Sequence, residues 1–150
     1  MKVAFVEPIN HIGLTSSITP LTLINVQSIN DNVFNKLLNF KEIIIDNGVF
    51  EFFHSKEFNE IDYEDIVRKQ LFFKEKLEEE GKKVYLVLPD VPFNYIETRK
   101  LSEKVLEQND YANFIGVIQG KNYEEVEEMC RFYKKWGVKL IAVPIRLREK

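Results

Sequence analysis

The chain has 150 residues, 45% of them hydrophobic, and a formal net charge of −3. This size and composition suit a single soluble domain with a hydrophobic core, which is predicted to span residues 1–150. The small negative charge gives no electrostatic case for nucleic-acid binding by the whole surface, and no apolar run approaches the length of about 18 residues that spans a bilayer.

Short apolar runs alternate with amphipathic stretches along the first half of the chain. Residues 3–6 and 21–29 are predicted as strands, and residues 10–20 between them as a polar loop. Residues 31–38 are predicted as a short helix that is capped by its first residue, an aspartate. Residues 43–45 are all isoleucine, a pattern typical of a strand that is buried on both faces.

The second half continues this alternation. The predicted helices span Tyr63 to Glu80, Asn94 to Gln108 and Tyr123 to Trp136. The predicted strands span Val84 to Leu88, Phe114 to Ile118 and Leu140 to Ile145. Asn94 and Asn122 are predicted helix caps, and Gly81 and Gly137 are predicted to end the helices before them.

The apolar positions of the last two predicted helices recur every three to four residues, so one face of each is predicted to be buried. The buried face of the earlier helix is predicted to comprise Ile96, Leu101, Val105 and Leu106. That of the later helix is predicted to comprise Val126, Met129, Tyr133 and Trp136, with Cys130 beside them in the core.

The alternation of strands and helices with short connections predicts parallel strands in an α/β fold. Two architectures fit: an open doubly wound sheet, and an incomplete (β/α)8 TIM-barrel-like fold with about six of the eight strands. The barrel is favoured, because the first strand-to-helix turn is not glycine-rich and polar residues follow several strands instead. A complete barrel usually needs roughly 200 residues or more, so a partner chain, or sequence missing from a fragment or split protein, is expected to supply the rest.

Three polar side chains directly follow predicted buried strands: Asp46, Asp90 and Gln119. Because neighbouring strands of a barrel lie about 4.8 Å apart and end on one face, we expect these side chains to converge within roughly 10 Å. Two carboxylates and a carboxamide can recognise a flat heterocycle, and a carboxylate can also transfer a proton or attack an anomeric carbon. Either aspartate could instead serve only the turn that follows its strand.

Cysteine and histidine give no sign of a metal site, since no group of them has the spacing of metal ligands. Cys130 is the only cysteine and cannot form an internal disulfide, so a cytoplasmic location is expected. The first residues become acidic too early for a secretory signal, which agrees with that location.

The segments around the three polar residues resemble the tRNA-guanine transglycosylase superfamily, especially its phage-type members that insert 7-deazaguanine into DNA. Ile45-Asp46-Asn47-Gly48-Val49-Phe50-Glu51 is similar to the family's Asp-Ser-Gly-Gly-Phe-Gln. Leu88-Pro89-Asp90-Val91 is similar to its aspartate-containing strand end, and Gly116-Val117-Ile118-Gln119-Gly120 looks like its Gly-Ile-Val-Gln-Gly. Ile141-Ala142-Val143-Pro144-Ile145 falls where the family has its next base-lining strand, so the likeness covers most of residues 43–145.

The resemblance implies a (β/α)8 barrel that exchanges a guanine-type base at a nucleotide through a covalent ribosyl-enzyme intermediate. The chain would then be a queuine/guanine tRNA-ribosyltransferase-like protein, with Asp46 as its catalytic acid/base. The residues implied to bind the 7-deazaguanine-type base are Asp90, Gln119, Gly120, Asn47, Gly48 and Phe50.

Several departures from the family limit what the resemblance implies. Asn47 stands where the family has serine, and Val49 where it has glycine. The family's nucleophilic aspartate and zinc-binding cysteines lie on later strands, beyond Lys150, so base recognition without a zinc cofactor is expected of these residues. The expected partners are the base and either DNA or tRNA.

Two other readings of the sequence stay open. The chain could be a non-catalytic barrel fragment that acts as a binding or assembly module, completed by a second copy or another chain. It could also be an unrelated barrel enzyme such as a lyase, which would call for a lysine at a strand end, and none is placed convincingly.

Overall fold

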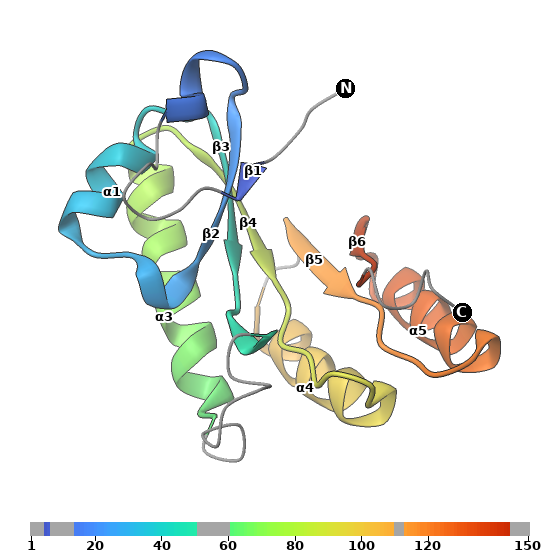
Figure 1. Cartoon of the computed structure of the whole chain (residues 1–150). Helices are drawn as coiled ribbons and strands as arrows, with labels where there is room; N and C mark the ends of the chain where they lie inside the picture. The colour runs from blue at the N-terminus through green and yellow to red at the C-terminus, as the bar shows by residue number, and fades with distance from the viewer. Residues whose placement is uncertain (1–4, 7–13, 51–60, 110–112, 145–150) are drawn as a thin grey trace. The chain divides into compact units, whose positions relative to one another are not determined.

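The computed structural model describes residues 5–6, 14–50, 61–109 and 113–144 (Figure 1). They divide into two compact units, one of Met1–Gly48 with Glu64–Leu86 and one of Val49–Tyr63 with Val87–Lys150. The organisation of residues 1–150 as one domain therefore stays a prediction. Among the described residues, no helix combines the length and the apolar character needed to cross a membrane.

The first unit is built on parallel strands that neighbour one another in chain order. They are β1 (Phe5–Val6), β2 (Leu21–Asn25), β3 (Glu42–Asp46) and β4 (Lys83–Val87), of which only Val87 is counted in the second unit. Asn25 at the end of β2 is in register with Asp46 at the end of β3. Ile43 and Ile45, on one face of β3, are fully buried, whereas Ile44 on the other face is half-buried, so the predicted burial of both faces is only partly met. The parallel α/β class is confirmed.

Two helices accompany these strands, α1 (Asp31–Leu37) and α3 (Tyr63–Glu79), whose buried residues include Ile66 and Leu77. The side-chain amide of Gln70 on α3 donates a hydrogen bond of 3.0 Å to the carbonyl oxygen of Ile45, which fixes the helix to β3. Gly81 has a φ of 77°, so it ends α3 in the left-handed conformation that favours glycine, as predicted.

The segment after β2 differs from its prediction as a strand that continues to Ile29. The strand ends at Asn25, and a 3-10 turn, η3 (Val26–Ser28), follows. The side-chain oxygen of Asn25 accepts a hydrogen bond of 2.9 Å from the backbone N–H of Gln27, and this local contact replaces the pairing of a longer strand. Another 3-10 turn, η2 (Leu14–Ser17), lies in the segment predicted as a polar loop.

The cap of α1 is also corrected. Asp31 was the predicted cap, but Asn30 fills that position with an extended backbone. Its side-chain oxygen accepts a hydrogen bond of 2.9 Å from the N–H of Val33, while Asp31 is the first helical residue. Asparagine and aspartate are both favoured at a helix N-cap. Where the two are adjacent, the sequence alone therefore fixes the first residue of the helix only to within one position.

The second unit contains a parallel pair of strands, β5 (Phe114–Val117) and β6 (Leu140–Ala142). Its helices are α4 (Tyr95–Gln108) and α5 (Tyr123–Lys135), capped by Asn94 and Asn122 as predicted. The backbone N–H of Leu88 donates to the carbonyl oxygen of Ile115 at 2.9 Å, so the residues that lead to Asp90 run beside β5. Gly137, with a φ of 73°, follows α5 in the predicted way.

Two predicted core positions in this unit are wrong. Ile96 is 51% exposed, and the buried face of α4 is formed by Thr98, Ser102, Val105 and Leu106. Cys130 is exposed, because it lies about 100° around the helix from the buried Met129. In its place, Phe132 joins the buried face of α5.

The corrected cap makes a testable prediction. Asn30→Ala should lower the free energy of unfolding by about 1 kcal/mol, because the N–H of Val33 loses its acceptor. Asp31→Ala should cost about 0.5 kcal/mol or less, since only a favourable charge near the helix dipole is lost. Urea denaturation of both variants measures the difference. A larger loss of unfolding free energy for Asp31→Ala than for Asn30→Ala would contradict this prediction and would identify Asp31 as the cap.

Candidate functional site

Two of the three predicted polar side chains meet in the second unit. The side-chain amide nitrogen of Gln119 donates a hydrogen bond of 2.7 Å to a carboxylate oxygen of Asp90. Gln119 follows β5, and Asp90 follows the segment that runs beside β5. Gln119 is only 6% exposed and Asp90 is half-buried, so this hydrogen bond is partly shielded from water.

The loop after Asp90 donates a hydrogen bond to the oxygen of the Gln119 side-chain amide. The side-chain oxygen of Gln119 accepts a hydrogen bond of 3.0 Å from the backbone N–H of Phe93. Phe93 has a φ of 62°, in the left-handed region, and a bulky side chain there costs about 1 kcal/mol or more. The contact with Gln119 helps to hold this strained residue. Sequence reasoning missed Phe93, because glycine or asparagine is the usual residue at a positive φ. The available signal was Pro92, which is common at the second position of a β-turn whose third residue has a positive φ.

Thr98 fixes the same loop to α4. Its side-chain oxygen accepts a hydrogen bond of 2.9 Å from the N–H of Val91 and lies 2.8 Å from the carbonyl oxygen of Asn94. The threonine is fully buried, whereas Val91 is half-buried and Asn94 is exposed, so these contacts are partly shielded from water. Val91 and Asn94 stand on either side of Phe93, and the loop that orients Gln119 is therefore anchored on both sides.

A buried pair of hydroxyl groups lies next to the backbone that carries Asp90 and Gln119. The Tyr133 hydroxyl donates to the carbonyl oxygen of Val117 at 3.1 Å and lies 3.2 Å from the Ser102 hydroxyl. Ser102 in turn lies 3.4 Å from the carbonyl oxygen of Pro89. With Tyr133 donating to Val117, the one proton of Ser102 goes either to Tyr133 or to Pro89. The pair thus links the residue before Asp90 to β5.

Two glycines of the quoted segments have packing roles in this unit. A Cβ atom on Gly116 would lie 2.7 Å from carbon atoms of the Tyr133 ring, so only glycine lets the ring approach β5 this closely. A Cβ atom on Gly120 would lie 3.1 Å from a methyl group of Val126, close to the start of α5. Gly120 is buried, and its predicted contact with a base stays a prediction.

Two tyrosines, Tyr63 and Tyr133, have a raised pKa to which the charge of the Asp90 carboxylate contributes. Burial, followed by the charge of Asp90, raises the pKa of Tyr63 to about 12. Burial is also the main cause that raises the pKa of Tyr133 to about 12, and the Asp90 charge adds to it. Both phenols therefore stay protonated at neutral pH, and neither can act as a base there.

The third predicted residue, Asp46, belongs to the first unit and forms a turn. One of its carboxylate oxygens accepts a hydrogen bond of 3.1 Å from the N–H of Gly48. Gly48 has a φ of 73°, in the left-handed region that favours glycine, and a Cβ atom there would also meet the side-chain amide of Asn25. Glycine is therefore favoured at this turn. The convergence of Asp46 with Asp90 and Gln119 stays a prediction.

The remaining predicted base contacts differ in exposure. Asn47 is buried, whereas Phe50 in the second unit is 57% exposed. Glu51 and Ile145 of the quoted segments lie outside the described residues. Among the residues that are described, no group of three or more His, Cys, Asp or Glu side chains could hold a metal ion.

The Asp90–Gln119 pair has a defined chemical capacity. A carboxylate accepts hydrogen bonds, and the amide nitrogen of Gln119 carries two N–H groups, one of which goes to Asp90. Side by side, an acceptor and a donor match the edge of a flat heterocycle that offers the opposite pattern.

Comparison of the chain with known protein families, curated proteins and solved structures finds no match.

The raised pKa of Tyr133 predicts a pH dependence of stability. Because the pKa is higher in the folded protein than the ordinary value of 10.0, the stabilisation is complete below pH 10 and is lost as pH rises toward about 12. Relative to Tyr133→Phe, the wild-type protein should lose about 1 kcal/mol of unfolding free energy between pH 9 and 11. Tyr123→Phe, at an exposed tyrosine, is the control and should follow wild type. Parallel curves for wild type and Tyr133→Phe would contradict the prediction.

Proposed function

We propose that the chain recognises a 7-deazaguanine-type base for base exchange in DNA or tRNA, as a queuine/guanine tRNA-ribosyltransferase-like protein. The hydrogen bond of 2.7 Å between Gln119 and Asp90 is the observation that carries the proposal. A guanine-type edge offers N–H donors beside a carbonyl acceptor. A carboxylate next to an amide N–H is complementary to that edge.

The proposed architecture is an incomplete (β/α)8 barrel. The parallel strands of the first unit, each beside the next in chain order, support it. The β5-α5-β6 arrangement of the second unit, again with parallel strands, supports it too. In such a barrel Asp46, Asp90 and Gln119 would all face the C-terminal mouth, where barrel enzymes bind their substrates.

The proposed role of Asp46 is that of an acid/base next to the bound base. Its position at the end of β3 and the hydrogen bond from the N–H of Gly48 would hold its carboxylate in place. The proposal for these residues covers base recognition, and it includes no metal or other cofactor. A reducing compartment, the cytoplasm, suits the free and exposed Cys130.

Calorimetry with 7-deazaguanine tests the base site. Wild-type protein should bind the base, and Asp90→Ala should weaken binding about tenfold or more, because a charged hydrogen-bond acceptor is lost. Glu107→Ala removes an exposed carboxylate from α4 of the same unit and should leave binding unchanged. Circular dichroism of each variant confirms that it is folded.

Two outcomes of this experiment would contradict the proposal. One is the absence of binding by folded wild-type protein. The other is equal binding by wild type and Asp90→Ala, which would place the base elsewhere. Adenine, which presents a different pattern of donors and acceptors, is the control base and should bind more weakly.

The exposed apolar side chains of β6 favour a second function, that of an assembly module. Leu140 and Ile141 are each 41% exposed, and Val143 is 47% exposed. Among the strands that the structure describes, β6 pairs with β5 and lies last in the strand order. An apolar edge strand favours pairing with another chain, and we propose a second copy of this chain as its partner.

Light scattering measures this assembly directly. Wild-type protein should have about twice the monomer mass of 17.8 kDa at micromolar concentrations. Ile141→Lys should return it to the monomer mass, because a charge on an edge strand opposes pairing. Lys139→Ala, next to the strand but without added charge on it, is the control. A monomeric wild-type protein would rule out the assembly. It would not affect the proposed base site, which calorimetry tests separately.

A further inference from the structure

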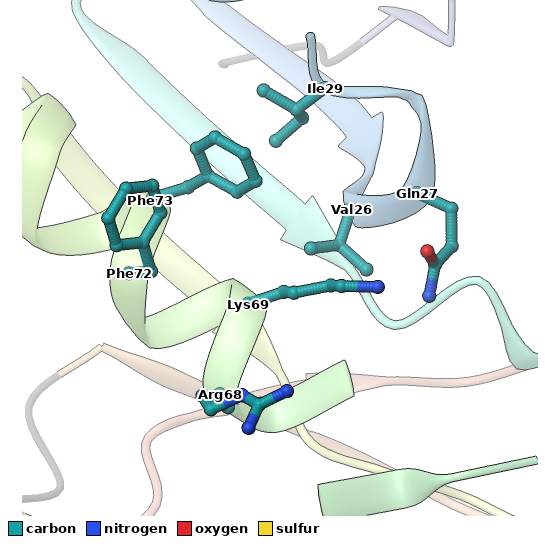
Figure 2. Close-up of a pocket in the computed structure, with 7 residues that line it drawn as sticks. All are labelled: Val26, Gln27, Ile29, Arg68, Lys69, Phe72 and Phe73. Carbon is teal, nitrogen blue, oxygen red and sulfur yellow. The ribbon is translucent and has the colours of Figure 1, made fainter. Parts of the chain in front are cut away.

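A pocket of about 460 Å³ lies in the first unit, between η3 and α3 (Figure 2). Its volume is within the range that small-molecule sites occupy, about 300–1,000 Å³. None of the residues that line it belongs to the proposed base site. The pocket is therefore a separate feature of the molecule.

The walls of the pocket are mainly apolar. Val26 and Ile29 line one side and are buried, and Phe72 and Phe73 of α3 line the other. Figure 2 shows Phe73 and Ile29 facing each other. Phe72 is 53% exposed, and its ring stands edge-to-face on that of Phe73 with the centroids 5.3 Å apart. A flat ring bound here would bury aromatic surface that now contacts water.

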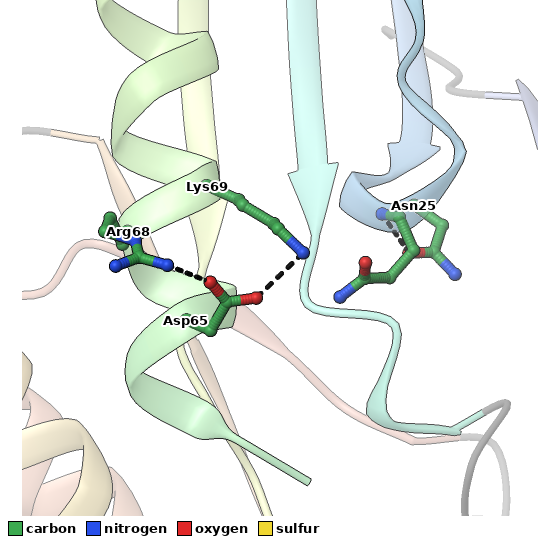
Figure 3. A network of polar contacts seen from close by, with 5 residues as sticks. Asn25, Asp65, Arg68 and Lys69 are labelled. Atoms are coloured by element: carbon green, nitrogen blue, oxygen red, sulfur yellow. Dashed lines mark hydrogen bonds and ion pairs between the residues drawn. The ribbon is translucent and has the colours of Figure 1, made fainter.

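Two cations, Arg68 and Lys69, line the same pocket. Asp65 pairs with both of them, and the Lys69 ammonium lies 2.8 Å from its carboxylate (Figure 3). One carboxylate is thus shared by two cations, and of the residues that line the pocket none is acidic. Arg68 and Lys69 therefore form the positive corner of its lining. In Figure 2, Lys69 extends from α3 toward Gln27, whose amide can also donate a hydrogen bond.

We propose that this pocket binds a flat aromatic ring that carries an anionic group, a molecule of about mononucleotide size. The ring packs between Phe73 and Ile29, beside the edge of Phe72. The anionic group is held by Lys69 and Arg68 at the positive corner. Both parts of the ligand are needed, since the walls supply apolar burial and the cations supply charge complementarity.

The charges of α3 favour such a small anion over a nucleic-acid strand. The acidic residues of this helix outnumber its basic residues by one, so the helix offers no continuous basic track. Lys76 stands near Phe72, with its ammonium 5.9 Å from the ring centroid, but it is paired with Glu79. Lys74 and Lys76 each pair with a glutamate of their own, whereas Arg68 and Lys69 share one aspartate.

Titration with adenosine 5′-monophosphate and with 2-naphthoate, followed by NMR shifts and calorimetry, tests the proposal. At least one of them should bind, and the comparison shows whether the site takes a phosphate or a carboxylate. Lys69→Gln should weaken binding about three- to fivefold, as expected for an exposed charge pair. Asp65→Asn should strengthen binding about as much, because it releases both cations.

Glu79→Gln is the matched control for Asp65→Asn. It removes one negative charge from the same helix, at a carboxylate that pairs with Lys76 and does not line the pocket. It should change the affinity by less than a factor of about two, so a specific effect of Asp65 is separated from a change in net charge. Phe72→Ala, at an exposed position, should weaken binding of either ligand without unfolding the protein.

Half-ligands complete the test. For a site that takes the monophosphate, adenosine, which lacks the anion, and inorganic phosphate, which lacks the ring, should each bind at least about tenfold more weakly than the whole ligand. For a site that takes 2-naphthoate, naphthalene and acetate are the corresponding half-ligands. No binding of either aromatic anion to folded wild-type protein would overturn the proposal, and so would equal binding of inorganic phosphate. Because the pocket shares no residue with the proposed base site, either failure leaves the calorimetric test with 7-deazaguanine unaffected.

Discussion

The amide of Gln119 is a polar group in a nearly dry environment, and the organisation of the second unit follows from how it is satisfied. A buried amide without partners costs several kcal/mol by transfer estimates, roughly 2–7 kcal/mol. Here Asp90 accepts from its nitrogen and the N–H of Phe93 donates to its oxygen. These contacts connect the end of β5 to the loop that begins at Asp90. The polar groups and the loop conformation therefore depend on one another.

A second set of contacts holds the backbone beneath that amide. Tyr133 lies against Gly116 and donates to Val117, and Ser102 lies within reach of both Tyr133 and Pro89. In this way α4 and α5 both contribute hydroxyl groups to the strand ends. A ring that fits only over glycine defines the distance between α5 and β5 closely. The spacing of Asp90 and Gln119 is thus set by packing as well as by their own hydrogen bond.

Much of the fold could be predicted because the apolar period differs between strands and helices. The all-isoleucine run became β3, and Asn94 and Asn122 capped their helices. The failures have local causes. Thr98 and Ser102 lie on the buried face of α4 because their hydroxyl groups have hydrogen-bond partners there. The pattern of hydrophobic residues does not indicate such partners.

The residues of the candidate sites could be predicted to different degrees, depending on whether the sequence pattern or the backbone conformation brings them together. Asp90 and Gln119 could be found because polar residues after buried strands are conspicuous in the sequence. Their contact with Phe93 could not, since it depends on a backbone conformation that the sequence leaves open. The pocket of the first unit was missed because the residues of η3 had been assigned to a longer strand. Its cations also look like ordinary surface charges in the sequence.

The resemblance to transglycosylases contains two kinds of residue, and the structure separates them. Gly48, Gly116 and Gly120 have a reason in a positive φ or in close packing, so their presence in the quoted segments does not by itself call for a ligand. Asp46 has a turn to stabilise, which accounts for a short polar residue there. The Asp90–Gln119 pair also supports the loop at Phe93, but it differs in one respect, because Asp90 is only half-buried and its carboxylate stays partly accessible. This polar pair is therefore the part of the resemblance from which a function can be argued.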